Sequence, residues 1–166
     1  VDGSWQLGPR PEHGIRKRHN LQGPIDDAFM DSFIFVRPSE SSPSSEVETW
    51  VEAELEHAIT HWRQQFRGDA RVKMDYEITD QDVLNANLIL WGDPQSNVLL
   101  NRMHSYLPIQ WENAELQVGS RHFEAEHHIP LMIFPNPLNP NRYIVLNSGF
   151  TYREFAYLNN ARQVPK

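Results

Sequence analysis

The chain has 166 residues, of which 39% are hydrophobic and 22% charged, as is typical of one soluble globular domain with a sizeable core. Its net charge of -7 argues against binding to nucleic acid, whose phosphates require a basic surface. The absence of cysteine excludes disulfides, thiolate zinc sites and cysteine nucleophiles. No apolar run approaches the roughly 20 residues of a membrane span. We therefore expect neither nucleic acid nor a membrane among the partners.

Two regions differ in composition. Residues 1–31 are rich in Gly, Pro, His and Arg and show no periodicity, which predicts an extended N-terminal arm anchored by Trp5 and Leu21. Residues 32–166 are expected to form a single α/β domain. Both ends of the sequence resemble linker, which favours a segment excised from a longer chain over a processed product.

Predicted strands alternate with predicted helices through the first part of this domain. Continuous apolar runs predict buried strands at 33–36 and 87–91, and alternating residues predict a strand with one exposed face, near a sheet edge, at 71–78. This alternation predicts a mostly parallel sheet with right-handed crossovers. The expected fold is therefore a three-layer, Rossmann-like or flavodoxin-like α/β fold.

The helices between these strands have recognisable ends. Ser45, followed by a glutamate three residues later, fits a capping box, and Gly68 fits a helix C-terminus. After the strand at 87–91, Asp93 is placed as an N-cap and Pro94 as the first residue of a helix that ends near Leu107.

The second half of the chain has a different pattern. Short polar-alternating runs within 109–123 predict an antiparallel section, a β-meander or hairpin, inserted in the main layer. Two apolar strands follow at 131–134 and 143–146, and we expect them to be antiparallel because the linker 135–141 is too short for a helical crossover. A terminal helix is predicted from Thr151.

The carboxyl ends of the parallel strands are the expected ligand site, because open α/β sheets bind ligands at that edge. The free amides of a helix that begins at Pro94 would favour a small anion such as phosphate or carboxylate, and Arg37 would add a charged fork. The alternative is that Gly92 and Asp93 form only a tight turn and a cap. The candidate ligand-binding residues are Arg37, Gly92, Asp93, Ser96, Asn97, Asn147 and Ser148.

No complete catalytic or metal-binding signature is present. Ser148 is the candidate nucleophile, but the sequence around it lacks the first glycine of a nucleophile elbow and the last histidine, His128, precedes it. His122, Glu124 and Glu126 alternate as metal ligands on a strand could, but an exposed polar strand face explains them equally. We therefore expect no metal and no cofactor.

Three segments carry a resemblance to a known family: 21–31 (LQGPIDDAFMD), 91–97 (WGDPQSN) and 143–149 (YIVLNSG). Together they resemble the C-terminal region of large bacterial proteins grouped with the prolyl-oligopeptidase-type α/β-hydrolases. In such proteins the nucleophile elbow lies upstream, so the resemblance implies an accessory domain whose partner is the catalytic domain of the parent chain. One position departs from the family pattern, since Phe150 stands where a histidine follows Asn-Ser-Gly.

The leading hypothesis is thus a non-catalytic accessory domain of a hydrolase, which contacts the catalytic domain or its substrate. The alternative is a small serine hydrolase or esterase in which Ser148 reacts. A third hypothesis is a carbohydrate-binding module that presents Trp5 and Trp111 on its surface.

Overall fold

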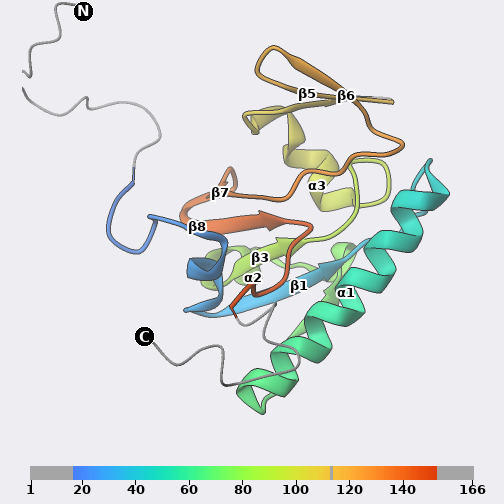
Figure 1. Cartoon of the computed structure of the whole chain (residues 1–166). Coiled ribbons are helices and arrows are strands. Elements are labelled where there is room, and N and C mark those ends of the chain that lie inside the picture. The colour runs from blue at the N-terminus through green and yellow to red at the C-terminus, as the bar shows by residue number, and fades with distance from the viewer. Residues whose placement is uncertain (1–16, 113, 153–166) are drawn as a thin grey trace, which may run out of the picture.

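The computed structural model describes residues 17–112 and 114–152. It is a mixed α/β structure with a five-stranded, mostly parallel sheet and a separate three-stranded antiparallel sheet (Figure 1). Among the described residues, no helix is both long and apolar enough to cross a membrane.

The main sheet has the strand order β2-β1-β3-β8-β7. Its strands are β1 (Phe33–Arg37), β2 (Val72–Met74), β3 (Asn87–Leu90), β7 (Met132–Asn136) and β8 (Asn139–Leu146). The first four strands in this order are parallel, whereas β7 pairs with β8 antiparallel. The predicted mostly parallel sheet and the predicted antiparallel pair are therefore confirmed.

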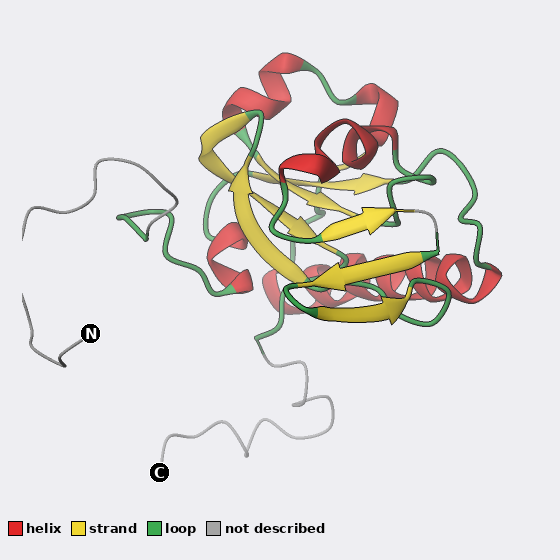
Figure 2. Ribbon diagram, turned by 90° about the horizontal axis from the view of Figure 1, so that it is seen from above, coloured by secondary structure: helices red, strands yellow, loops and turns green. Residues whose placement is uncertain are grey.

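Helices lie on both sides of this sheet, as Figures 1 and 2 show. The helical elements are α1 (Ser45–Phe66), α2 (Asp80–Asn85), α3 (Val98–Met103) and three 3-10 helices (Ile25–Phe29, Asp75–Glu77 and His104–Tyr106). The long helix α1 packs on one face of the sheet, and α3 packs on the other.

Alternate residues of the central strands build two hydrophobic clusters. Phe35 and Ile89 point towards α1, whereas Val36 and Leu90 point towards α3, and all four side chains are fully buried. Because both faces are covered, the central strands need apolar residues at every position, which explains the continuous apolar runs in the sequence.

The ends of two predicted elements differ from the observed ones. The N-cap of α1 is Ser44, not Ser45, and its Oγ accepts a hydrogen bond from the backbone N–H of Val47 (3.2 Å). The strand predicted at 71–78 ends at Met74, because the following residues turn into a 3-10 helix. It does lie at the edge of the sheet, as predicted.

The small sheet contains β4 (Gln110–Glu112), β5 (Glu115–Val118) and β6 (Arg121–Glu124), all antiparallel. The predicted antiparallel section is confirmed, but it forms a sheet of its own and is not inserted in the main layer. Trp111 and Leu116 join the hydrophobic cluster around α3. Trp111 is only 5% exposed, so it is not the surface platform that the carbohydrate-binding hypothesis requires.

The described part of the N-terminal segment is tied to the main domain. Leu21 is buried, and Phe29 of the first 3-10 helix packs edge-on against Phe33 of β1. The predicted anchor Trp5 lies outside the described residues, as does the helix predicted from Thr151 apart from its first two residues.

Candidate functional site

The loops that follow β1, β3 and β8 meet at one end of the parallel sheet. The side chain of Asn147, directly after β8, donates to the carbonyl oxygen of Gly92 (3.0 Å) and accepts from the backbone N–H of the same glycine (2.8 Å). The backbone N–H of Glu40, in the loop after β1, donates to the carbonyl oxygen of Ser96 (3.0 Å). All three loops are thus joined by their own polar groups.

The helix predicted to begin at Pro94 begins instead at Val98, so this prediction is wrong. Its N-cap is Asn97, whose Oδ1 accepts from the backbone N–H groups of Leu99 (3.1 Å) and Leu100 (3.0 Å). The Nδ2 of Asn97 donates to a carbonyl oxygen at the end of the preceding strand (2.9 Å), which holds the cap in place. Asn97 is therefore a buried structural residue.

Asp93 closes a tight turn rather than capping a helix. Its Oδ1 accepts from the backbone N–H groups of Gln95 (2.8 Å) and Ser96 (2.9 Å). The Oγ of Ser96 accepts in turn from the backbone N–H of Asp93 (2.9 Å). Asp93 is 6% exposed and Ser96 is 2% exposed, so this exchange fixes the loop from within.

The amides that an anion would use are already occupied. Every backbone N–H within 91–101 donates to an acceptor of the chain itself. One acceptor is the buried carboxylate of Asp75, which receives the N–H of Val98 (2.6 Å). This loop consequently offers an anion no unoccupied amide in the described structure.

Ser148 is not arranged as a nucleophile. Its Oγ donates to the carbonyl oxygen of Gly149 (3.2 Å) rather than to an imidazole or a carboxylate, and the residue is 7% exposed. The left-handed backbone that sharpens this turn belongs to Asn147 (φ 49°), not to the serine. Phe150 is buried and packs edge-on against Phe29, so it serves the core.

A first cavity, which we call the Arg37 cavity, lies above the ends of β1 and β3 and has a volume of about 280 Å³. It is lined by the loop 37–42, by Glu48 and Glu52 of α1 and by Gly92. Arg37 forms an ion pair with Glu56 of α1, so the expected charged fork is already committed. The walls carry more carboxylates than cations.

A second cavity, the Trp111 cavity, has a volume of about 350 Å³. It is lined by the loops 42–44 and 93–95, by Trp111 and by residues of the turn 125–126, and it adjoins the Arg37 cavity at Ser42. The candidate residues Gly92 and Ser96 thus line one cavity, and Asp93 lines the other.

The sequence did not reveal these two cavities. The spacing of Glu48 from Ser45 predicts only a capping box, although Glu48 and Glu52 are four residues apart and therefore share one face of α1. The single apolar position of Trp111 in a short strand does not indicate that its side chain joins the hydrophobic cluster around α3.

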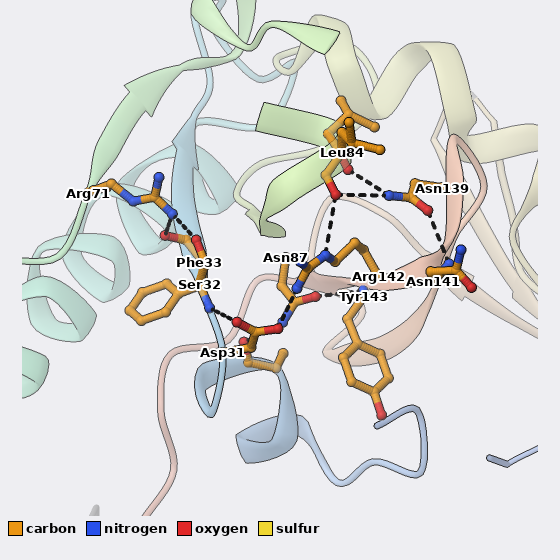
Figure 3. Close-up of polar contacts among 12 residues, drawn as sticks. Asp31, Ser32, Phe33, Arg71, Leu84, Asn87, Asn139, Asn141, Arg142 and Tyr143 are labelled. Atoms are coloured by element: carbon orange, nitrogen blue, oxygen red, sulfur yellow. Dashed lines mark hydrogen bonds and ion pairs between the residues drawn. The ribbon is translucent and has the colours of Figure 1, made fainter. Parts of the chain in front are cut away.

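A polar network occupies the opposite end of the sheet (Figure 3). Asp31 forms an ion pair with Arg142, and the backbone hydrogen bond from Ser32 lowers the pKa of Asp31 further than its burial raises it. Tyr143 donates to Asp27, and burial together with this hydrogen bond raises the pKa of the tyrosine to about 12.

This network ties the N-terminal segment to β8, and its carboxylates are engaged within the chain. The two histidines next to carboxylates are likewise paired, His122 with Glu115 and His127 with Glu46, and this pairing raises the pKa of His127. No group of three or more His, Asp or Glu residues in the described ranges could hold a metal ion.

No protein-family model matches the chain, and no curated protein matches it either.

Proposed function

We propose that this chain is a non-catalytic accessory α/β domain of a prolyl-oligopeptidase-type hydrolase. In this role it contacts the catalytic domain of the parent chain, or a polypeptide substrate, through the loops at the carboxyl end of its parallel sheet.

One observation carries the proposal. At the edge where an α/β domain of this kind would place its reactive groups, the buried polar side chains hold backbone groups of their own loops. Asn147 bonds to Gly92, Asp93 bonds to its own turn, and the hydroxyl of Ser148 donates to a carbonyl oxygen. A catalytic site needs a nucleophile beside a base. Such loops instead suit a fixed binding surface, since their shape does not depend on a ligand.

The strand order supports the same location. The chain passes from β1 to β2 on one side and then returns to β3 on the other side of β1. Such a reversal creates a crevice in doubly wound folds, where ligands bind beyond the carboxyl ends of the strands. We therefore also propose a flavodoxin-like, three-layer arrangement, with the Arg37 cavity over its crevice.

An active-site serine reagent tests the absence of catalysis. The chain is incubated with a fluorophosphonate, and covalent labelling is read by mass spectrometry, with Ser148→Ala as the matched control. We expect no labelling of either protein. Labelling that disappears in Ser148→Ala would contradict the proposal and support a serine hydrolase.

The accessory role also makes a prediction about the natural polypeptide. The reading frame upstream of Val1 must encode a hydrolase domain with its own nucleophile elbow, and substitution of Ser148 must leave the peptidase or esterase activity of the whole polypeptide unchanged. A reading frame without such a domain would refute the accessory role.

A further inference from the structure

We propose that the Trp111 cavity binds a lysine or arginine side chain of a polypeptide. This inference rests on the proposed function, since it names the kind of group that the accessory domain would recognise.

The first argument is the unused oxygen of Asp93. This carboxylate is nine-tenths buried and lines the cavity, and its Oδ1 already accepts two backbone hydrogen bonds. Its Oδ2 makes no hydrogen bond within the described part of the chain, yet it is not among the atoms sealed from solvent. A half-used carboxylate in such a position favours a charged donor, because charge-assisted hydrogen bonds are the stronger ones.

The second argument is the sign of the charge. The described residues that line the Trp111 cavity include the carboxylates of Asp93 and Glu126 and no Lys, Arg or His. The adjoining Arg37 cavity adds Glu40, Glu48 and Glu52, and its arginine is already paired. A recess lined by charges of one sign concentrates the opposite charge, so a cation is attracted to this end of the domain.

The third argument is the shape of the ligand that these walls suit. Pro43, Ala114 and Ala125, none of them fully buried, offer apolar surface beside the carboxylate. The long alkyl stem of lysine or arginine packs on such surface while its charged head reaches a polar partner. A bare metal ion suits the site poorly, since the described residues contain no cluster of ligands for one.

Peptide titrations followed by NMR test this inference. The peptide acetyl-Gly-Lys-Gly-amide is compared with its norleucine analogue, which keeps the stem and lacks the charge. We expect the lysine peptide to shift the signals of Gln95 and Trp111 saturably and the norleucine peptide to leave them unchanged. Equal shifts from both peptides, or none from the lysine peptide, would overturn the inference.

Variants assign the effect to the cavity. Asp93→Asn keeps an acceptor for the turn and replaces the unused oxygen by an amide donor, so we expect binding about tenfold weaker. Glu126→Gln, whose side chain makes no hydrogen bond or ion pair in the described ranges, should weaken binding about threefold.

Glu112→Gln is the matched control, because it removes the same charge from the exposed side of β4, next to Trp111. We expect it to bind as the parent does. Equal weakening in Glu112→Gln and in the cavity variants would show a general charge effect and overturn the inference. If Asp93→Asn fails to fold, Glu126→Gln decides the comparison. Serine labelling reports on catalysis and the peptide titration on binding, so a failure of one proposal can be told from a failure of the other.

Discussion

Replacement of Asn147 by alanine is expected to lower the free energy of unfolding by about 3–7 kcal/mol. The side chain of Asn147 is 1% exposed and bonds to both the N–H and the carbonyl of Gly92, so it extends the pairing of β3 and β8 by one further step. Alanine would leave both groups of this buried glycine without their partner.

The magnitude follows from two contributions. A buried backbone donor or acceptor left without a partner costs about 1–3 kcal/mol. At Gly92 two such groups, the N–H and the carbonyl oxygen, would lose their partner. Asn147 also has a left-handed backbone, φ 49°, which asparagine tolerates and which costs alanine about 1 kcal/mol.

Urea denaturation followed by tryptophan fluorescence measures the effect. Asn147→Gly separates the two contributions, since glycine accepts the left-handed backbone and lacks the side chain, and it should retain about 1 kcal/mol more stability than Asn147→Ala. A loss below about 1 kcal/mol in Asn147→Ala would refute the view that this residue joins the loops.

Three further predictions concern stability and titration. Gly92→Ala should cost about 2 kcal/mol or more in urea denaturation, because at φ +97° its Cβ would lie 2.5 Å from Ser96 Oγ; an unchanged midpoint would contradict this. Burial raises the pKa of Asp82, but its hydrogen bonds, that from Lys73 foremost, lower it to about 2. The stabilisation, at most about 2 kcal/mol, is therefore present above about pH 4 and lost as the pH falls towards 2. Asp82→Asn should abolish that part of the pH dependence, and an unaltered acid profile would argue against it. Tyr143, with a pKa of about 12, should give an ionisation step near that pH in an ultraviolet absorbance titration. Tyr143→Phe should remove that step, and a step that persists in the variant would contradict the assignment.

Local pattern sufficed for the central sheet. The runs 88–90 and 144–146 are apolar at every position because helices or loops cover both faces of the sheet there, so the sequence pattern itself indicates their burial. The short linker before Tyr143 likewise sufficed to predict an antiparallel pair. In the structure the two strands extend into that linker, and Pro135 is tolerated there because β7 is an edge strand.

The sequence pattern did not predict the correct start of α3, because two residues are suitable as its N-cap. Asp93 before a proline and Asn97 four residues later are both good N-caps, and sequence spacing favoured the first. The structure selects Asn97 through distant contacts. Its Nδ2 donates to the carbonyl oxygen of Trp91, directly after β3, and the carboxylate of Asp75 accepts from the first N–H of α3. Neither contact can be predicted from sequence spacing. The spacing therefore predicts a helix that begins at Pro94 and, with it, an anion site.

Amide hydrogen exchange across residues 91–101, with and without inorganic phosphate, tests the central claim most directly. The account predicts slow exchange of the N–H groups of Gly92, Ser96 and Val98 in the absence of any anion, and no change when phosphate is added, because these groups are bonded within the chain. Fast exchange that phosphate slows would contradict the account. It would show that these loops await an anion rather than form a finished binding surface.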